Sequence, residues 1–199
     1  MFAKLKPIDD HIKGKGAQYN PDNKFSKLRL DTSDPDSWQE FTDLERPQTQ
    51  VFIEHPRKII SEYQSPDVPG AYSVNAYQGC EHGCVYCYAR ESHQYWGFSA
   101  GLDFESKIIV KLNAAELLRS EFKKKSYKPG TIMLSGNTDC YQPLEKKYEL
   151  TRKLLEVLLE FRNPVGIITK NALIERDLDI LKQMADHHLV HVMFSITTL

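Results

Sequence analysis

The sequence lacks any apolar run that approaches the ~20 residues needed to cross a bilayer. Residues 1–10 lack the apolar core of a signal peptide, so we expect a cytoplasmic protein rather than a secreted or membrane-bound one. Neither sign of charge is in excess, because 26 basic and 27 acidic side chains leave a formal net charge of −1. This balance gives no support for tight, non-specific nucleic-acid binding, although it does not exclude a nucleic-acid substrate.

Cysteine is also scarce. There are four in 199 residues, and three of them fall within residues 80–87. Without an export signal, such a cluster indicates a metal site rather than a disulfide framework. The remaining composition, 41% apolar and 27% charged, is ordinary for a soluble globular protein of one medium domain, or for part of a larger one.

Proline divides the chain into two parts, since seven of the ten prolines lie within the first 69 residues. Proline removes backbone donors and restricts the residue before it, so we interpret residues 1–70 as a mostly irregular N-terminal arm with one strand at residues 50–54. Four large aromatic side chains in this arm need burial, which predicts that it packs over the main domain: Phe25, Trp38, Phe41 and Phe52.

Residues 71–199 alternate between short apolar runs and helical periodicity. The expected strands span residues 71–76, 131–134, 165–169 and 189–196, with a short extended run at 106–110. Helices are expected at 88–96, after Asn113 (with Glu116 completing a capping box), from Pro143 to Phe161, and around 178–184. This alternation predicts an α/β fold of about four parallel βα units.

The informative segment is a loop with the spacing Cys80-x3-Cys84-x2-Cys87, just after the first of these strands. Thiolates are soft ligands that suit an iron–sulfur cluster or zinc. A structural zinc site needs four ligands, and the fourth cysteine, Cys140, lies more than fifty residues away, although His82 could replace it. Three thiolates on a four-iron cluster leave one iron open to a small molecule.

This segment, with Tyr86 directly before the third cysteine, resembles the radical SAM superfamily. The longer pattern looks like its DNA-repair-photolyase-like branch, which is related to spore photoproduct lyase. The segments that carry the resemblance are Lys13–Ala17 with Asn20-Pro21, Ser65–Asp67, Gly79–Arg90, Gly101–Glu105 and Ser135–Pro143.

The resemblance implies a partial (β/α) barrel over residues 71–199 and a 4Fe–4S cluster held by Cys80, Cys84 and Cys87. S-adenosylmethionine would chelate the open iron, and one electron would cleave it to methionine and a 5′-deoxyadenosyl radical that takes hydrogen from an unknown substrate. The electron would come from a donor such as a flavodoxin or ferredoxin. The residues that we expect to contact S-adenosylmethionine are Tyr86, Asn137, Thr138, Lys170 and Ser195, the last four at the carboxyl ends of expected strands.

Three alternatives remain open at this point. The chain could be a nucleic-acid repair lyase of the spore photoproduct lyase type, a non-catalytic iron–sulfur protein, or a zinc knuckle. Cys140 could be an inert buried thiol, which we favour, a hydrogen donor to a product radical, or a ligand to another group. Asp139 and Glu145 could serve as acid or base. The sequence does not identify the substrate.

The last expectation concerns length, because the resemblance implies a barrel of six strands and we count four. We expect a shortened chain that lacks roughly two βα units of ~30 residues each, with an exposed apolar strand at residues 190–199. Such a chain should be marginally stable and weakly active. Thermal unfolding and 5′-deoxyadenosine production, compared between this chain and a longer one, check the expectation. A cooperative, soluble and active 199-residue protein contradicts it.

Overall fold

The computed structural model describes residues 12–25, 48–62 and 72–196. Trp38 and Phe41, which we expected to be buried, lie outside these residues. None of the helices within the described ranges is long and apolar enough to cross a membrane.

The larger of two sheets has five strands in the order β2-β3-β6-β7-β8. The strands from β3 to β8 are parallel to their neighbours, and only the edge strand β2 is antiparallel. Their bounds are Ile60–Glu62 (β2), Tyr72–Val74 (β3), Ile132–Leu134 (β6), Val165–Thr169 (β7) and Val190–Phe194 (β8). The four parallel strands are the four expected from the sequence, so the prediction of parallel strands in an α/β fold is confirmed.

The smaller sheet has the order β1-β5-β4. Strand β1 (Gln50–Glu54) runs parallel to β5 (Lys107–Lys111), and β4 (Tyr77–Gln78) runs antiparallel to β5. The strand expected at residues 50–54 is therefore confirmed. The extended run expected at 106–110 is a full strand with two partners, which periodicity alone does not indicate because it carries no information on distant pairing.

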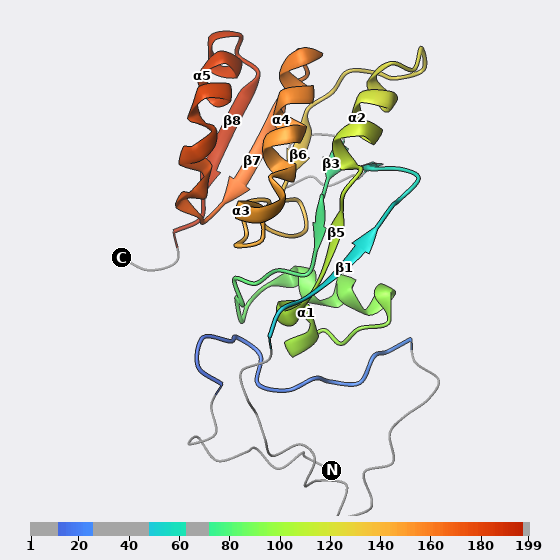
Figure 1. The fold of residues 1–199 in the computed structure, drawn as a ribbon, viewed down its shortest axis with the longest axis vertical. Helices are drawn as coiled ribbons and strands as arrows, with labels where there is room; N and C mark the ends of the chain where they lie inside the picture. Colours follow the sequence, from blue (N-terminus) through green and yellow to red (C-terminus); the bar gives the residue numbers. More distant parts are fainter. Residues whose placement is uncertain (1–11, 26–47, 63–71, 197–199) are drawn as a thin grey trace, which may run out of the picture.

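Figure 1 shows α2, α4 and α5 as a row of neighbouring helices over the larger sheet. Their apolar faces join the buried core, to which Leu118, Leu154 and Met184 contribute. The longer helices span Ala114–Phe122 (α2), Leu150–Glu160 (α4) and Leu178–Asp186 (α5). The other helices are η3 (Tyr88–Trp96), α1 (Leu102–Ser106), α3 (Glu145–Tyr148) and η4 (Ala172–Asp177), of which η3 and η4 are 3₁₀ helices.

Two local predictions are wrong. The helix expected after Pro143 is broken at Glu149, whose φ of 51° is left-handed, so α3 and α4 are separate. The capping box at Asn113 does not form, because the backbone there is not extended (φ −89°, ψ 14°) and the side chain makes no capping hydrogen bond. The Asn113 amide instead donates to the Pro56 carbonyl oxygen at 3.4 Å.

The two described aromatics of the arm are less buried than expected. Phe25 is 52% exposed and lies against Tyr95, with 4.8 Å between ring centroids. Phe52 is 39% exposed and lies 5.0 Å from the Phe98 ring. The prediction of burial is therefore wrong for both, because each aromatic rests on another side chain at the surface rather than entering the core.

The histidine of η3 is a deeply buried polar side chain. His93 is 1% exposed, with its ring 5.2 Å from that of Phe98 and 5.6 Å, edge on, from that of Phe104. Burial lowers the pKa of His93 to about 4, which outweighs the opposing effect of the nearby Asp103 carboxylate. The imidazole is therefore neutral in the folded protein at neutral pH.

This burial predicts a loss of stability in mild acid. An unfolded histidine titrates near pH 6.5, whereas His93 in the folded chain titrates near pH 4. Between these two pH values the unfolded chain binds a proton at residue 93 and the folded chain does not. The free energy of unfolding should fall over this window by up to about 3 kcal/mol. Denaturant titrations across the window should show a smaller fall in His93→Phe than in the wild type. An unchanged slope contradicts the prediction, and His187→Phe, at an exposed histidine, is the control.

Candidate functional site

A cavity opens at the carboxyl ends of the parallel strands, where ligand sites of α/β proteins usually lie. Four parts of the chain meet there: the loop after β4, the turn after β6, and the ends of β7 and β8. The lining residues are Cys80, His82, Cys84, Tyr86, Cys87, Tyr88, Ser135, Asn137, Thr138, Asp139, Ile168, Thr169, Lys170 and Ser195. The three motif cysteines thus share one cavity with all five of the residues that we expect to contact S-adenosylmethionine.

All three motif cysteines are free thiols. Cys80 is buried, and this burial raises the pKa of its thiol to about 12, whereas Cys84 and Cys87 are half-buried. Within the described ranges, no three His, Cys, Asp or Glu side chains converge as the ligands of a single metal ion would. A 4Fe–4S cluster needs no such convergence, since each thiolate binds a different iron atom. Three soft donors around one cavity therefore fit the cluster.

Lys170, directly after β7, brings a positive charge to the cysteines. Its Nζ donates to Cys84 Sγ and to the Tyr86 hydroxyl oxygen, both at 2.9 Å. Partial burial lowers the pKa of Lys170, but these hydrogen bonds raise it by more, so the net pKa lies above the ordinary value. The ammonium therefore keeps its charge and makes this wall of the cavity suitable for an anionic group.

Asp139 fastens the turn after β6 to the end of β7. Its carboxylate accepts hydrogen bonds from Thr169 Oγ1 at 2.7 Å and from the Lys170 amide at 3.1 Å, and its Oδ2 lies 3.4 Å from His82 Nε2. Burial raises the pKa of Asp139, but the close contact with His82 Nε2 and the hydrogen bond from Thr169 lower it by more. The carboxyl group is thus ionised at neutral pH, which suits an acceptor and makes it a poor general acid.

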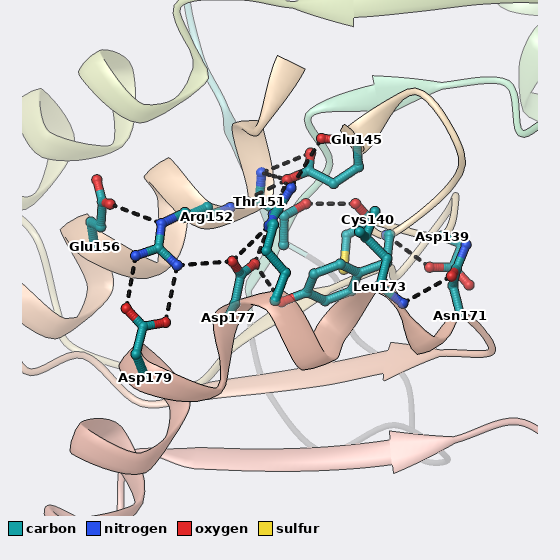
Figure 2. Close-up of polar contacts among 12 residues, drawn as sticks. Asp139, Cys140, Glu145, Thr151, Arg152, Glu156, Asn171, Leu173, Asp177 and Asp179 are labelled. Atoms are coloured by element: carbon teal, nitrogen blue, oxygen red, sulfur yellow. Dashed lines mark hydrogen bonds and ion pairs between the residues drawn. The ribbon is translucent and has the colours of Figure 1, made fainter. Parts of the chain in front are cut away.

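Glu145, the other acid or base that we considered, lies outside the cavity. It is fully buried and accepts from the Tyr77 hydroxyl at 2.5 Å, the Thr151 amide at 3.1 Å and Arg176 Nη2 at 2.8 Å. Figure 2 shows it within a polar network that includes the buried Asp177 together with Arg152, whose guanidinium group also contacts Asp179 and Glu156. With its oxygens occupied in this way, Glu145 supports the fold and is not a group for chemistry.

The side chains of Asn137 and Thr138 hold the cysteine loop as well as face the cavity. Asn137 Nδ2 donates to Gln78 Oε1 at 2.5 Å, and Thr138 Oγ1 donates to the Tyr77 carbonyl oxygen at 2.8 Å. Both hydrogen bonds link the turn after β6 to the strand that precedes Cys80. The Thr138 hydroxyl already uses its proton in the bond to Tyr77, so toward a cofactor it can act only as a hydrogen-bond acceptor.

Cys140 differs from the other cysteines. It lies in the hydrophobic core outside the cavity, and burial raises the pKa of its thiol. This surrounding agrees with an inert thiol, the role that we favoured.

Several lining residues were not singled out from the sequence as site residues: Tyr88, Ser135, Ile168 and Thr169. Tyr88 donates from its hydroxyl to the Gly136 carbonyl oxygen at 2.6 Å, which joins the cysteine loop to the turn after β6. Ser135, at a left-handed φ of 67°, accepts from the Cys140 amide at 2.8 Å. Ser135, Ile168 and Thr169 lie at or next to the ends of strands, and this position is the sequence signal that could have identified them.

The arrangement predicts different results for the four cysteines. Replacement of Cys80, Cys84 or Cys87 by alanine should abolish cluster binding, because each thiolate would hold a separate iron. Cys140→Ala should retain the cluster, since its thiol faces the core. Iron and sulfide content with the visible spectrum after anaerobic reconstitution provide the measurement. A normal iron content in Cys84→Ala contradicts the assignment.

Comparison with known proteins identifies a family whose model matches this chain. The radical SAM superfamily model matches residues 74–199. An uncharacterized protein of Mycobacterium tuberculosis is 39% identical over 129 residues, which cover 65% of this chain and 38% of that protein. An uncharacterized protein of Methanocaldococcus jannaschii is 34% identical over 119 residues, with 59% and 42% covered. An uncharacterized protein of Acidianus two-tailed virus is 28% identical over 138 residues, with 67% and 44% covered.

No solved structure matches the chain. The matched part spans less than half the length of each of these curated relatives. The superfamily model covers more than half of the chain, including the last residue of β3, the cysteine loop and the whole of β6, β7 and β8. This chain therefore belongs to the radical SAM superfamily.

Proposed function

We propose that the chain holds a 4Fe–4S cluster through Cys80, Cys84 and Cys87 and binds S-adenosylmethionine beside it. The observation that supports this most directly is the shared cavity of the three thiols and Lys170 at the carboxyl ends of the strands. Cys80, Cys84 and Cys87 would hold the cluster, which would supply one electron for cleavage of S-adenosylmethionine and so a 5′-deoxyadenosyl radical able to take a hydrogen atom from a substrate. The chain's own residues bind the cofactors and orient them.

Lys170 is the residue that we assign to the carboxylate of S-adenosylmethionine. Its ammonium keeps its charge, and its present acceptors, Cys84 Sγ and the Tyr86 hydroxyl, are the groups that a bound cluster and cofactor would rearrange. A charged hydrogen bond in a partly enclosed site contributes about 1.5–3 kcal/mol. Lys170 should therefore carry much of the affinity for the cofactor.

The other walls offer contacts of different kinds. The ring of Tyr86 is largely exposed and lies at the mouth of the cavity, where it can pack against a planar base. Asn137, fixed by Gln78, and Ser195, just after β8, are further polar residues that line the cavity. We assign these residues, with Thr138, to orientation of the cofactor.

The curated relatives extend well beyond the part that this chain matches, so the substrate and partners are matters for proposal. We propose a small one-electron donor such as a flavodoxin or ferredoxin as one partner. Production of 5′-deoxyadenosine can be measured without knowledge of the substrate.

Production of 5′-deoxyadenosine tests the proposal. The anaerobically reconstituted and chemically reduced protein should convert S-adenosylmethionine to 5′-deoxyadenosine and methionine. Lys170→Gln should retain its iron and bind S-adenosylmethionine roughly 10- to 100-fold more weakly, in line with the loss of a charged hydrogen bond. Lys182→Gln, at an exposed lysine on α5, is the matched control and should behave as the wild type.

Two outcomes contradict the proposal. Protein that is loaded with cluster but yields no 5′-deoxyadenosine would be a non-catalytic iron–sulfur protein. Equal affinity for S-adenosylmethionine in Lys170→Gln and Lys182→Gln would remove Lys170 from the cofactor site while leaving the cluster assignment in place.

A further inference from the structure

A fully buried carboxylate lies behind the cysteine loop, on α1. Glu105 is 0% exposed, and its oxygens accept hydrogen bonds from the Gly16 amide at 3.1 Å, the Ala17 amide at 2.8 Å and Arg90 Nη2 at 2.5 Å. Burial of a charge is costly unless it is paired and hydrogen-bonded, and Glu105 meets both conditions. None of the residues that line the cavity takes part in these bonds.

Arg90 connects Glu105 to the backbone of Cys84. Its Nε and Nη2 donate to the Cys84 carbonyl oxygen at 3.1 and 2.9 Å, and its Nη1 donates to the Gly101 carbonyl oxygen at 3.2 Å. The rigid, planar fork of the guanidinium group lets one side chain hold Glu105 and Cys84 in a fixed relation. The backbone of Cys84 is therefore positioned by a residue that does not touch the cavity.

Gly16, in the N-terminal segment, lies directly against Gly83 in the cysteine loop. A side chain on Gly16 would overlap the Gly83 carbonyl oxygen, so residue 16 lies directly on the backbone next to Cys84. Gly83 has a φ of 62°, and a Cβ there would lie 2.7 Å from Glu105 Oε2. These two positions require glycine because backbone and carboxylate leave no room for a methyl group.

Further contacts tie the same segment to α1. Asn20 exchanges two hydrogen bonds with Asp103, at 2.9 and 2.8 Å, and Lys15 Nζ donates to the Glu105 carbonyl oxygen at 3.1 Å. The Leu102 amide also donates to the Tyr19 carbonyl oxygen at 3.3 Å. Residues 15–20 thus lie along α1 and end against the bend of the cysteine loop.

We propose that residues 15–17, Arg90 and Glu105 form a clasp that sets the Gly83–Cys84 bend in the conformation that binds the cluster. Glu105 and Gly16 are positioning residues in this clasp and touch neither cluster nor substrate. The inference rests on the proposed cluster at Cys80, Cys84 and Cys87. It adds that an N-terminal segment distant in sequence from those cysteines determines how firmly they hold iron.

Iron release to a chelator tests the clasp, with Gly16→Ala compared against Gly97→Ala in the full chain. Both introduce one methyl group, but Gly97 has a φ of 80° with open space around it and lies outside the clasp. Residues behind metal ligands typically affect metal retention by 10- to 100-fold. Gly16→Ala should therefore lose iron about tenfold faster than the wild type, whereas Gly97→Ala should lose it at the wild-type rate even if its melting temperature falls. The electron paramagnetic resonance signal of the reduced cluster should change only in Gly16→Ala.

A second pair of variants covers a failure of Gly16→Ala to fold. Asn20→Ala removes exposed hydrogen bonds that hold the segment carrying residues 15–17 against α1, without disturbing the buried charge, and Lys124→Ala removes an exposed ion pair elsewhere. Faster iron release in Asn20→Ala alone supports the clasp. Equal release rates in both members of each pair, or release that merely follows the melting temperature, overturns it. Wild-type protein that binds no cluster contradicts the proposed function itself, which separates the two failures.

Discussion

Backbone hydrogen bonds between β6 and its two parallel neighbours, β3 and β7, determine where the site lies. Strand β6 has only three residues, all buried, and pairs along its whole length with both neighbours. Because the three strands point the same way, the turn after β6 and Lys170 meet the cysteine loop at one edge. An antiparallel neighbour would have placed its polar end at the opposite edge of the sheet.

Around that sheet, the cysteine loop is held by polar contacts on two sides. Gln142 binds the loop on the inner side, accepting from the Glu81 amide and donating to the Gly79 carbonyl oxygen. Arg90 binds it on the outer side through the Cys84 carbonyl oxygen. A loop with three thiols has little apolar surface with which to fix itself, so its shape depends on these donors and acceptors. Burial of charged groups such as Glu105 and Glu145 favours one specific arrangement rather than a large gain in stability.

The local features of this arrangement could be predicted from sequence, and the long-range ones could not. Short apolar runs predicted the parallel strands, and the spacing of Cys80, Cys84 and Cys87 marked a segment that lines the cavity, because both signals lie within a few residues. The pairing of β1 with β5 and the role of Glu105 depend on segments far apart in the chain. The break at Glu149 shows the same limit, since nothing in the helical periodicity of Leu150 to Phe161 marks the left-handed residue before it.

The contact between Lys170 and Cys84 has a consequence for the timing of assembly. The two residues are 86 positions apart, so a ribosome adds the lysine after the cysteine by an interval of roughly 4–17 s at about 5–20 residues per second. During that interval the thiols exist without the wall that faces them, whereas the N-terminal residues that lie behind them have already been made. Nascent chains therefore acquire the back of the cysteine loop before its front, and a complete cavity only late in synthesis.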